Sequence, residues 1–422
     1  MKEGARVRLV SSSPSARHPQ ANATPRRSVA AARSWSGPAI LSHGFRPFFL
    51  CAGVWALIGV ALWFLAFGGA IKAPTAFSIV DWHAHEMIFG YSGAVIAGFL
   101  LTAIPNWTGR LPVAGLPLAG LVALWAAGRV AIYVSAAIGR FAAGAIDAAF
   151  LVVFAGVVAA EVISGRNSRN AKVVALVAAL ALSNIAFHIE DARTGLAKYS
   201  TRGALVFIVM LILLIGGRVT PSFTNNWLAK ASVGERPVPF GRADGAVLAG
   251  SGLSLAAWIA APESRATGAL LLAAGLANLW RLSRWRGLVA RRDALVLVLH
   301  AGYFFAALGF VAAGAAALWP GRMPHAVGVH VWAIGGAGVM TLAMMTRATL
   351  GHNGRALIAS RGTRLAYACL GVALIARTAM ALAPRFDLLM MHIAAIAWIA
   401  GFAAFLFVYG PLLVMRNRRA KL

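Results

Sequence analysis

Long apolar runs constrain the fold of this chain more than any other feature of its sequence. Between Pro47 and Gly410, short polar or arginine-bearing breaks separate apolar stretches, each close to the roughly 20 residues that a helix needs to cross a ~30 Å hydrocarbon layer. Sixty per cent of the residues are hydrophobic and only 12% are charged, against about a quarter charged in soluble domains. The sequence therefore predicts an all-α, polytopic integral membrane protein in a lipid bilayer.

We expect about twelve transmembrane helices. Their approximate bounds are 47–70, 84–104, 116–138, 141–163, 171–190, 203–217, 244–262, 266–283, 294–318, 325–346, 363–383 and 388–414. They would form one membrane domain over residues 47–415, followed by a basic cytoplasmic C-terminus at 416–422.

Residues 1–46 are rich in Ser, Ala, Pro and Arg and lack the apolar core of a secretory signal. We expect a disordered basic tail in the cytoplasm. A basic arm on anionic lipid is one alternative, and a misassigned start codon that leaves this segment untranslated is another.

The formal charge of +27 raises the question of a nucleic-acid partner. Most of the 39 Lys and Arg residues lie in alternate loops, as the positive-inside rule predicts for a chain with both termini in the cytoplasm. They sit in short membrane-flanking loops without a nucleic-acid-binding motif, so we expect no nucleic acid. Cys51 and Cys369 both fall inside expected spans, which excludes a disulfide framework and a CxxC motif.

Histidine is the informative residue type, because a polar side chain inside a bilayer is costly and usually functional. Six of the ten histidines fall near the outer ends of spans on this topology: His83, His85, His188, His325, His330 and His392. Imidazole is a common ligand of copper, zinc and haem iron, so their convergence would make a metal site. The alternative is a polar belt at the headgroups, with Trp82 and Trp332.

The strongest local signal is the segment WHAHEM at residues 82–87. On a helix, residues i and i+2 point to different sides, so His83 and His85 would bind one metal only if the backbone were extended. Two separate centres are equally compatible with the segment. Glu86 would either orient an imidazole or be a favourable charge in a first helical turn.

Other polar residues within spans extend this candidate set. Asn184 and His188 are four residues apart and share a helix face, which favours a polar wall or a helix-end cap. His300, one turn before Tyr303, is the least interfacial histidine.

Charged residues within spans need neutralising partners. We expect an ion pair between Arg129 and Asp147 on neighbouring helices, with proton relay as the alternative role of Asp147. Arg377 would face a partner, water or an anionic group such as a haem propionate.

Three inner loops resemble one another, each after an even-numbered span: residues 104–110, 218–226 and 346–355. Their similar spacing favours three four-helix modules, each with a histidine-bearing helix near a shared axis. Coincidence is the alternative.

The sequence resembles the NnrS family of bacterial membrane proteins. The segments that carry the resemblance are SHGFRPFFL at 42–50, WHAHEMIFGYSGAVIAGFLLTAIPNWTGR at 82–110, NIAFHIE at 184–190, RVTPSFT at 218–224, and 330–355, which ends in MMTRATLGHNGR. The resemblance implies a protein of the bacterial inner membrane that contains haem and copper and helps cells to withstand nitric oxide, often beside denitrification genes.

The family motifs include His83, His85, His188 and His330, while His352 belongs to the inner motif, where Asn353 replaces a more usual Thr. By analogy with haem-copper oxidases, we expect His83 or His85 to face His330 across a haem, with His188 and His300 as candidates for copper or a second haem. No adjacent His-His pair of the oxidase kind is present. The expected partners of these ligands are Glu86, Asn184, Asp147, Arg129 and His352.

Three functions are compatible with the sequence. The first is relief of nitrosative stress by binding nitric oxide or its iron and thiol adducts. The second is an oxidoreductase that acts directly on nitric oxide and uses a proton path such as Asp147. The third is a transporter or metal-delivery protein, which the nearly charge-free midplane disfavours.

Overall fold

The computed structural model describes residues 35–232 and 234–416, and every regular element in these ranges is helical. The all-α class is therefore confirmed. Most of the expected N-terminal tail, residues 1–34, lies outside the described residues, as do residues 417–422 of the expected C-terminal segment. Residues 35–46 contain the 3-10 turn η1 (Ala39–Leu41) and the first residues of α2.

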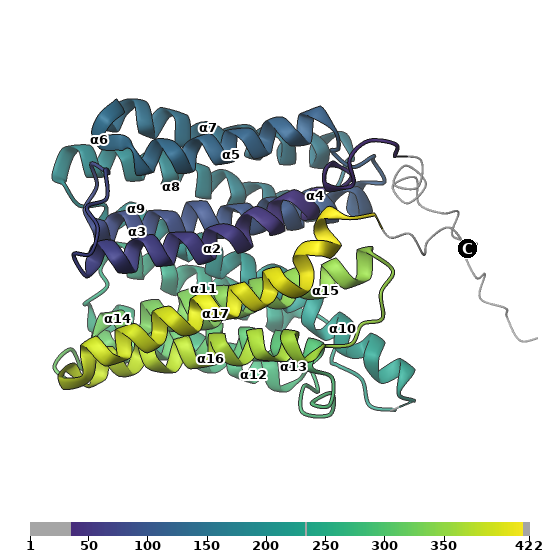
Figure 1. Cartoon of the computed structure of the whole chain (residues 1–422). Helices are drawn as coiled ribbons and strands as arrows, with labels where there is room; N and C mark the ends of the chain where they lie inside the picture. The colour runs from purple at the N-terminus through teal and green to yellow at the C-terminus, as the bar shows by residue number, and fades with distance from the viewer. Residues whose placement is uncertain (1–34, 233, 417–422) are drawn as a thin grey trace, which may run out of the picture.

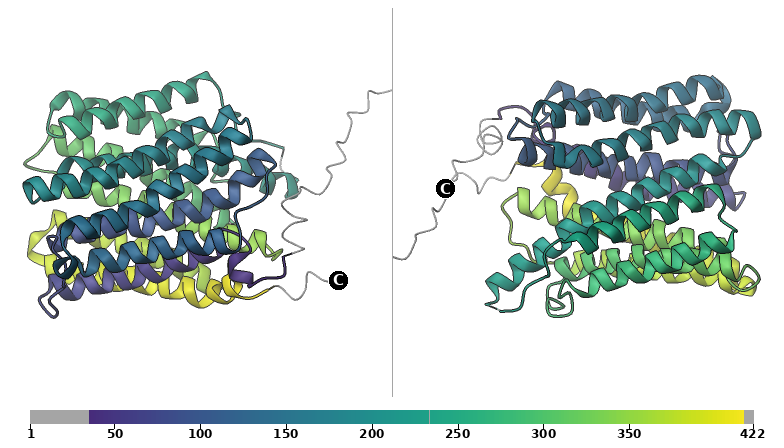
Figure 2. Two further views of the ribbon diagram at one scale, coloured as in Figure 1. Left: turned by 90° about the horizontal axis from the view of Figure 1, so that it is seen from above. Right: turned by 180° about the vertical axis from the view of Figure 1, so that it is seen from behind.

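The helices run along one common direction (Figures 1 and 2). The first are α2 (Phe45–Phe67), α3 (Ile79–His85) continued by η2 (Glu86–Ser92) and α4 (Gly93–Thr108), α5 (Leu116–Tyr133), the short α6 (Ser135–Ile138) and α7 (Arg140–Ser164). They are followed by α8 (Ala171–Thr194), α9 (Lys198–Leu211) continued by η4 (Ile212–Gly216) and α10 (Gly217–Lys230), α11 (Arg242–Ala260) and α12 (Arg265–Ser283). The last are α13 (Ala294–Leu318), α14 (His325–His330) continued by η5 (Val331–Gly338) and α15 (Val339–His352), α16 (Arg361–Leu382) and α17 (Asp387–Val414).

Within the described residues, eleven continuous helices are long and apolar enough to span a membrane. The remaining expected span, 266–283, is α12, which contains Asn278 and Arg281 and is not among these eleven. Both side chains are buried among other helices, so α12 belongs to the bundle as well. The structure thus agrees with the expectation of about twelve helices.

Three of the continuous helices form the centre of the bundle: Ile79–Thr108, Lys198–Lys230 and His325–His352. They are the most buried of the candidate spans, at 78%, 72% and 72% of their most apolar windows, and they contact one another. Each contains a π-helical segment, η2, η4 or η5. Single-turn π segments often mark functional sites in helices.

The packing around these central helices repeats three times along the chain. The first helix of each group, α2, α8 or α13, packs on its central helix, and the next two pair as α5 with α7, α11 with α12, and α16 with α17. Each last helix then packs on the first of the following group, α7 on α8 and α12 on α13, and α17 closes the ring on α2. This is the packing that three four-helix modules require.

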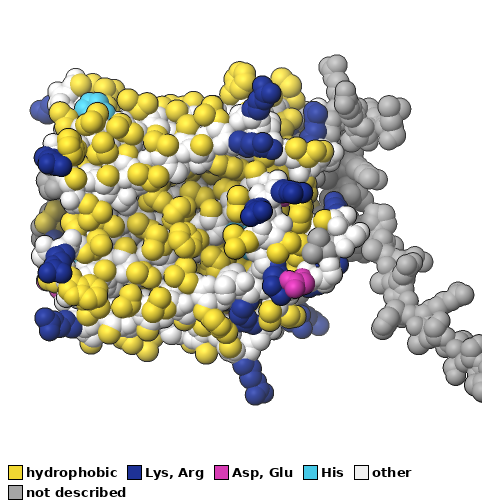
Figure 3. Space-filling view, turned by 90° about the horizontal axis from the view of Figure 1, so that it is seen from below, with side chains coloured by type: hydrophobic (Ala, Val, Ile, Leu, Met, Phe, Trp, Pro, Cys, Tyr) yellow, Lys and Arg dark blue, Asp and Glu magenta, His cyan; other side chains and the backbone are white. Residues whose placement is uncertain are grey.

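The two ends of the bundle differ in the residues that gather there. We call the end where α3, α9 and α14 begin the histidine end, and the end where described residues 35 and 416 lie the terminal end (Figure 1). At the terminal end Arg416 donates to the carbonyl oxygens of Trp35 and Gly37 at 2.6 and 2.7 Å. Figure 3 shows hydrophobic side chains over the middle, with Lys and Arg toward both ends, as a bilayer requires.

Local sequence signals set the helix ends. Ser78 begins α3 by accepting a hydrogen bond from the Asp81 amide at 3.0 Å, and Asp293 begins α13 by accepting from Leu295 and Val296. Such caps satisfy amides that have no partner inside the helix. Gly109 ends α4 with φ +73°, a conformation that glycine adopts without strain. These signals place His83 and His85 at the start of a central helix.

Candidate metal site at the histidine end

Three ligand-type side chains from three helices meet near the histidine end. His85 ends α3, Asp147 lies in α7 and His188 lies in α8. The Nε2 atoms of both histidines lie 3.0 Å from Oδ2 of Asp147. Within the described residues this is the one group of three His, Cys, Asp or Glu side chains with one potential ligand atom each within 4.8 Å of the others. We call it the His85–Asp147–His188 cluster.

A second carboxylate and an arginine complete the surroundings of this cluster. Glu86 Oε1 lies 3.0 Å from Nδ1 of His85, and its Oε2 accepts from Arg129 at 2.9 Å. The Arg129 guanidinium also pairs with Asp147, which is the ion pair expected from the sequence. Asn184 donates to Oδ2 of Asp147 at 2.7 Å. All of these polar groups are almost fully buried.

The charges of this group do not balance when the histidines are neutral. Glu86 and Asp147 carry two negative charges and Arg129 carries one positive charge, so the buried set has a net charge of −1. A net charge in a low-dielectric interior is strongly unfavourable unless another charge offsets it. One more positive charge, either a proton or a metal ion, would neutralise the group.

The contacts of the two ring nitrogens of His85 also indicate that one positive charge is missing. A neutral imidazole has one N–H donor, yet both nitrogens of His85 lie 3.0 Å from a carboxylate oxygen. If Nδ1 donates its proton to Glu86, then a lone pair of Nε2 faces a lone pair of Asp147 Oδ2, and the two atoms repel each other. A cation between these atoms would bind both of them and remove the repulsion.

The donor set fits a metal ion such as copper or zinc. Ligand atoms about 2.0–2.2 Å from one ion in a tetrahedral site lie about 3.3 Å from each other, close to the 3.0 Å separations from Asp147 to both histidines. A histidine ligand usually donates its second N–H to a carboxylate, which is the position of Glu86 against His85. Imidazole and carboxylate donors bind copper and zinc readily.

Small residues make room for this arrangement. A Cβ at Gly90 would lie 2.6 Å from Nη1 of Arg129 and 2.9 Å from Oε2 of Glu86. A Cβ at Gly144 would lie 2.9 Å from Cγ of His188. These glycines are positions of the candidate site that the sequence analysis did not identify. Their signal was a small residue one helical turn from a charged residue within a span, at Gly90 after Glu86 and Gly144 before Asp147.

His83 lies on another side of α3, because the backbone there is helical rather than extended. Its ring packs 4.3 Å from that of Trp63, and its Nδ1 is buried with no hydrogen-bond partner among the described residues. It lies close to His330 and Arg377. His330 donates from Nδ1 to the Ala326 carbonyl at 2.7 Å, which leaves Nε2 for another partner.

The remaining candidate histidines lie apart from the cluster. His300 is buried and its Nε2 lies 2.8 Å from the Thr224 hydroxyl, in the half of α13 nearer the terminal end. His325 is exposed, and His392 is exposed beside Phe64 at a ring distance of 4.8 Å. The structure therefore separates His300 from the cluster at the histidine end.

His352 lies at the terminal end of α15, stacked on Phe45 with 5.2 Å between ring centroids. Its neighbour His43 precedes α2, and burial, with the nearby charges of His352 and Arg46, lowers the pKa of His43 to about 4. His43 is thus neutral at pH 7. The structure does not bring His352 to the His85–Asp147–His188 cluster.

A second buried polar group, which the sequence reasoning missed, lies nearer the terminal end. Arg281 of α12 donates to Asp244 of α11 at 3.0 Å and to the Tyr303 hydroxyl at 2.8 Å, and Tyr303 donates to Asn278 at 2.8 Å. Its sequence signal was the pair of polar residues, Asn278 and Arg281, inside an expected span. Arg284 also pairs with Asp244, at 3.3 Å, so this group has no excess of negative charge.

The sequence was also compared with known proteins. No curated protein matches it. The family model described as NnrS protein matches residues 39–417, which is nearly the whole chain and includes every residue of the His85–Asp147–His188 cluster. The chain therefore belongs to the NnrS family.

Proposed function

We propose that this protein binds copper through His85, His188 and Asp147 and protects a bacterial cell against nitric oxide. The observation that carries the proposal is the buried group of three ligand-type side chains in a polar set that lacks one positive charge. Copper(II) binds imidazole more strongly than the other divalent metals of the first row. Nitric oxide and its iron or thiol adducts are the proposed ligands of the loaded protein.

Haem is the second group that we propose, with His330 and His83 as its ligands. The fit rests on the buried, unpartnered Nδ1 of His83 and on the Ala326 carbonyl, which fixes the His330 tautomer with Nε2 free. Arg377, which lies close to both rings, would neutralise a propionate. Copper and haem iron, when bound, supply metal centres to which nitric oxide can bind.

The side chains around the cluster would hold and shield the metal. Glu86 would accept the Nδ1 proton of His85 and so fix its tautomer. Arg129 would hold both carboxylates in place. Phe77, Phe89 and Phe187 pack around the His85 ring with centroid distances of 4.8–6.3 Å, which limits access of water to the site.

We further propose that the histidine end faces the outside of the bacterial inner membrane and that both termini are cytoplasmic. The distribution of Lys and Arg supports this orientation by the positive-inside rule. Nitric oxide is small, uncharged and membrane-permeant, so a site within the bilayer region at this end would be accessible to it.

Metal analysis and optical spectra of the purified protein, with and without nitric oxide, test this function. We expect copper and haem in the wild type, loss of copper in His85→Ala, loss or shift of the haem band in His83→Ala and His330→Ala, and a spectral change on addition of nitric oxide. A folded wild-type protein that binds neither metal when supplied with both would rule out the proposal.

An oxidoreductase acting directly on nitric oxide is the second candidate. The observation in its favour is the buried Asp147, Glu86 and His85 set, in which protons and metal ions can occupy the same positions. Catalytic turnover of nitric oxide by the purified protein with an artificial electron donor would support the enzyme. Stoichiometric binding without turnover would support a protective binding protein.

A further inference from the structure

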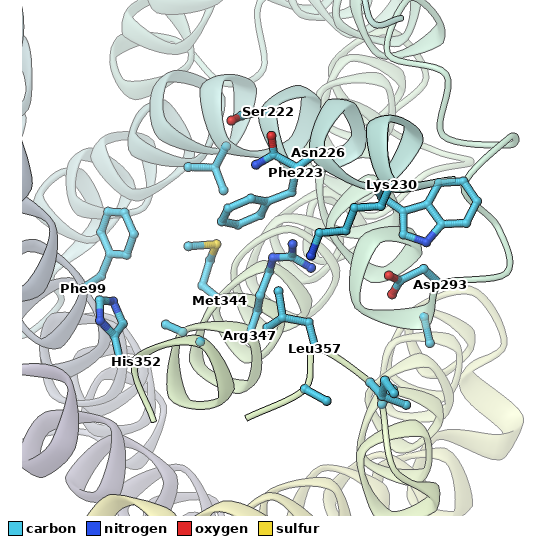
Figure 4. Close-up of a pocket in the computed structure, with 18 of the residues that line it drawn as sticks. Phe99, Ser222, Phe223, Asn226, Lys230, Asp293, Met344, Arg347, His352 and Leu357 are labelled. Atoms are coloured by element: carbon cyan, nitrogen blue, oxygen red, sulfur yellow. The ribbon is translucent and has the colours of Figure 1, made fainter. Parts of the chain in front are cut away.

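A large cavity lies at the terminal end of the bundle, opposite to the proposed metal site. Its volume is about 1600 Å³. The C-terminal ends of all three central helices contribute to its wall, α4 with Trp107, α10 with Phe223 and α15 with Arg347. These are the segments whose similar sequences follow the even-numbered spans. Figure 4 shows side chains from α10, α15 and the start of α13 around the same space.

The charged residues of this wall are mostly positive. Lys230, Arg292, Arg347 and Arg364 line the cavity together with one acid, Asp293. Asp293 uses its Oδ1 to cap α13. A concave surface with this excess of positive charge attracts anions.

Arg347 is the most informative of these cations. It is 7% exposed, its Nη1 is buried without a hydrogen-bond partner in the described part of the chain, and its guanidinium lies 4.0 Å from the centre of the Phe223 ring. Figure 4 shows it between Lys230 and Met344, directed into the cavity. A buried guanidinium with an unused donor is unfavourable unless a further acceptor satisfies it.

The rest of the wall is largely apolar and aromatic. Phe45, Phe99 and Phe223 line the cavity, with Trp107 and Trp227. Flat aromatic surfaces favour ligands that carry a ring or another apolar body. Ser222 and Asn226 add polar side chains near Lys230 on α10.

We propose that this cavity binds an organic anion with a flat apolar body, which enters from the terminal end and places its anionic group on Arg347 and Lys230. Arg347 forms the charge-assisted hydrogen bonds with its unused donor, because a planar guanidinium matches a carboxylate. Lys230, which is exposed, supplies a second positive charge at the entrance. The aromatic side chains that line the cavity pack against the apolar body of the ligand.

The probes for this site are 2-naphthoate and 2-naphthamide, which have the same ring system but differ in charge. Binding is measured by calorimetry on the full-length protein in nanodiscs of uncharged lipid. We expect 2-naphthoate to bind saturably and 2-naphthamide to bind at least tenfold more weakly. Arg347→Gln should weaken the binding of 2-naphthoate by at least tenfold and Lys230→Gln by about threefold. Arg347→Lys keeps the positive charge but lacks the planar pair of donors, so it should recover only part of the affinity.

Arg322→Gln is the matched control, because it removes one arginine charge from an exposed position between α13 and α14 at the other end of the bundle. Its affinity for 2-naphthoate should equal that of the wild type. Equal binding of both probes, or wild-type affinity in both Arg347→Gln and Lys230→Gln, would overturn the proposal. An affinity for inorganic phosphate equal to that for 2-naphthoate would also overturn the proposal, because the apolar body would then contribute nothing to binding. These affinities do not depend on the metal content of the protein, so the result is independent of the proposed copper site.

Discussion

At the scale of single residues, Asp147 connects most of the proposed metal site. One of its oxygens lies against His85, His188 and Asn184, and the other pairs with Arg129. Its charge therefore holds together four helices, α3, α5, α7 and α8. Removing that charge affects both metal binding and stability, and the two effects can be separated.

Asp147→Asn should abolish copper binding, because it removes a ligand. It should lower the free energy of unfolding of the metal-free protein by less than the roughly 3–5 kcal/mol typical of a broken buried ion pair, because Glu86 still neutralises Arg129. Copper content and denaturant unfolding in micelles measure the two effects. Asp191→Asn is the control, since Asp191 is also buried and paired with an arginine, Arg140, at 2.6 Å. It should lose stability but keep copper; loss of copper in both variants would show that the metal depends on general packing.

Gly144→Ala tests the space around His188. The added methyl group would lie 2.9 Å from Cγ of the imidazole and must displace it, so we expect at least tenfold weaker copper affinity with little change in helical content. Gly156→Ala is the matched control on the same helix, because a Cβ there meets nothing within 4 Å. A competition titration with a copper chelator gives the affinities. Equal affinities in the two variants would contradict the role of His188 as a ligand.

The sequence predicted part of this residue-level arrangement. The Arg129–Asp147 pair was expected because two opposite charges in neighbouring spans need each other, and the structure confirms it. The sequence indicated Glu86 and Asp147 as partners of the candidate ligands, but it did not assign both to His85, because these contacts depend on how far each helix is rotated about its axis. No pattern in a single sequence determines that rotation.

At the scale of elements, the π-helical segment η2 sets the direction in which His85 points. A π turn contains one more residue than an α turn, so it rotates the residues before it by about 100° relative to those after it. Apolar runs predicted the continuous helix Ile79–Thr108 but not this segment. Its length and hydropathy are those of an ordinary span, and only packing against α2 and α9 reveals the extra residue.

Deleting Met87, within η2, should restore a regular α-helix and turn His85 away from Asp147. We expect the helical signal in circular dichroism to remain and copper binding to be lost. Met87→Ala removes the same side chain without changing the register, so it should bind copper as the wild type does. Retention of copper by the deletion variant would show that η2 does not position His85.

At the scale of the whole molecule, the bundle has two chemically different ends. The histidine end contains the His85–Asp147–His188 cluster, and the terminal end contains the basic, aromatic cavity. The sequence predicted the separation of the histidines from the basic loops. It did not predict the cavity, because the residues that line it come from helix ends and loops of all three groups of helices.

The orientation of these ends in the membrane is testable with cysteines in a background without Cys51 and Cys369. Gly321 lies between α13 and α14 at the histidine end, and Gly234 lies between α10 and α11 at the terminal end; both are exposed and without close neighbours. In intact spheroplasts, a membrane-impermeant maleimide should label Gly321→Cys. Gly234→Cys should react only after permeabilisation. The opposite labelling pattern would show that the protein has the opposite orientation in the membrane.

We propose that His85 and His188 bind one metal ion together with Asp147. Pulsed electron paramagnetic resonance of the Cu(II)-loaded protein tests it most directly, because the remote nitrogen of each coordinated imidazole gives its own coupling. We predict couplings from two imidazoles in the wild type and from one in His188→Ala, with no change in His392→Ala. A bound copper ion without imidazole couplings, or with couplings that survive unchanged in His85→Ala and His188→Ala, would contradict it.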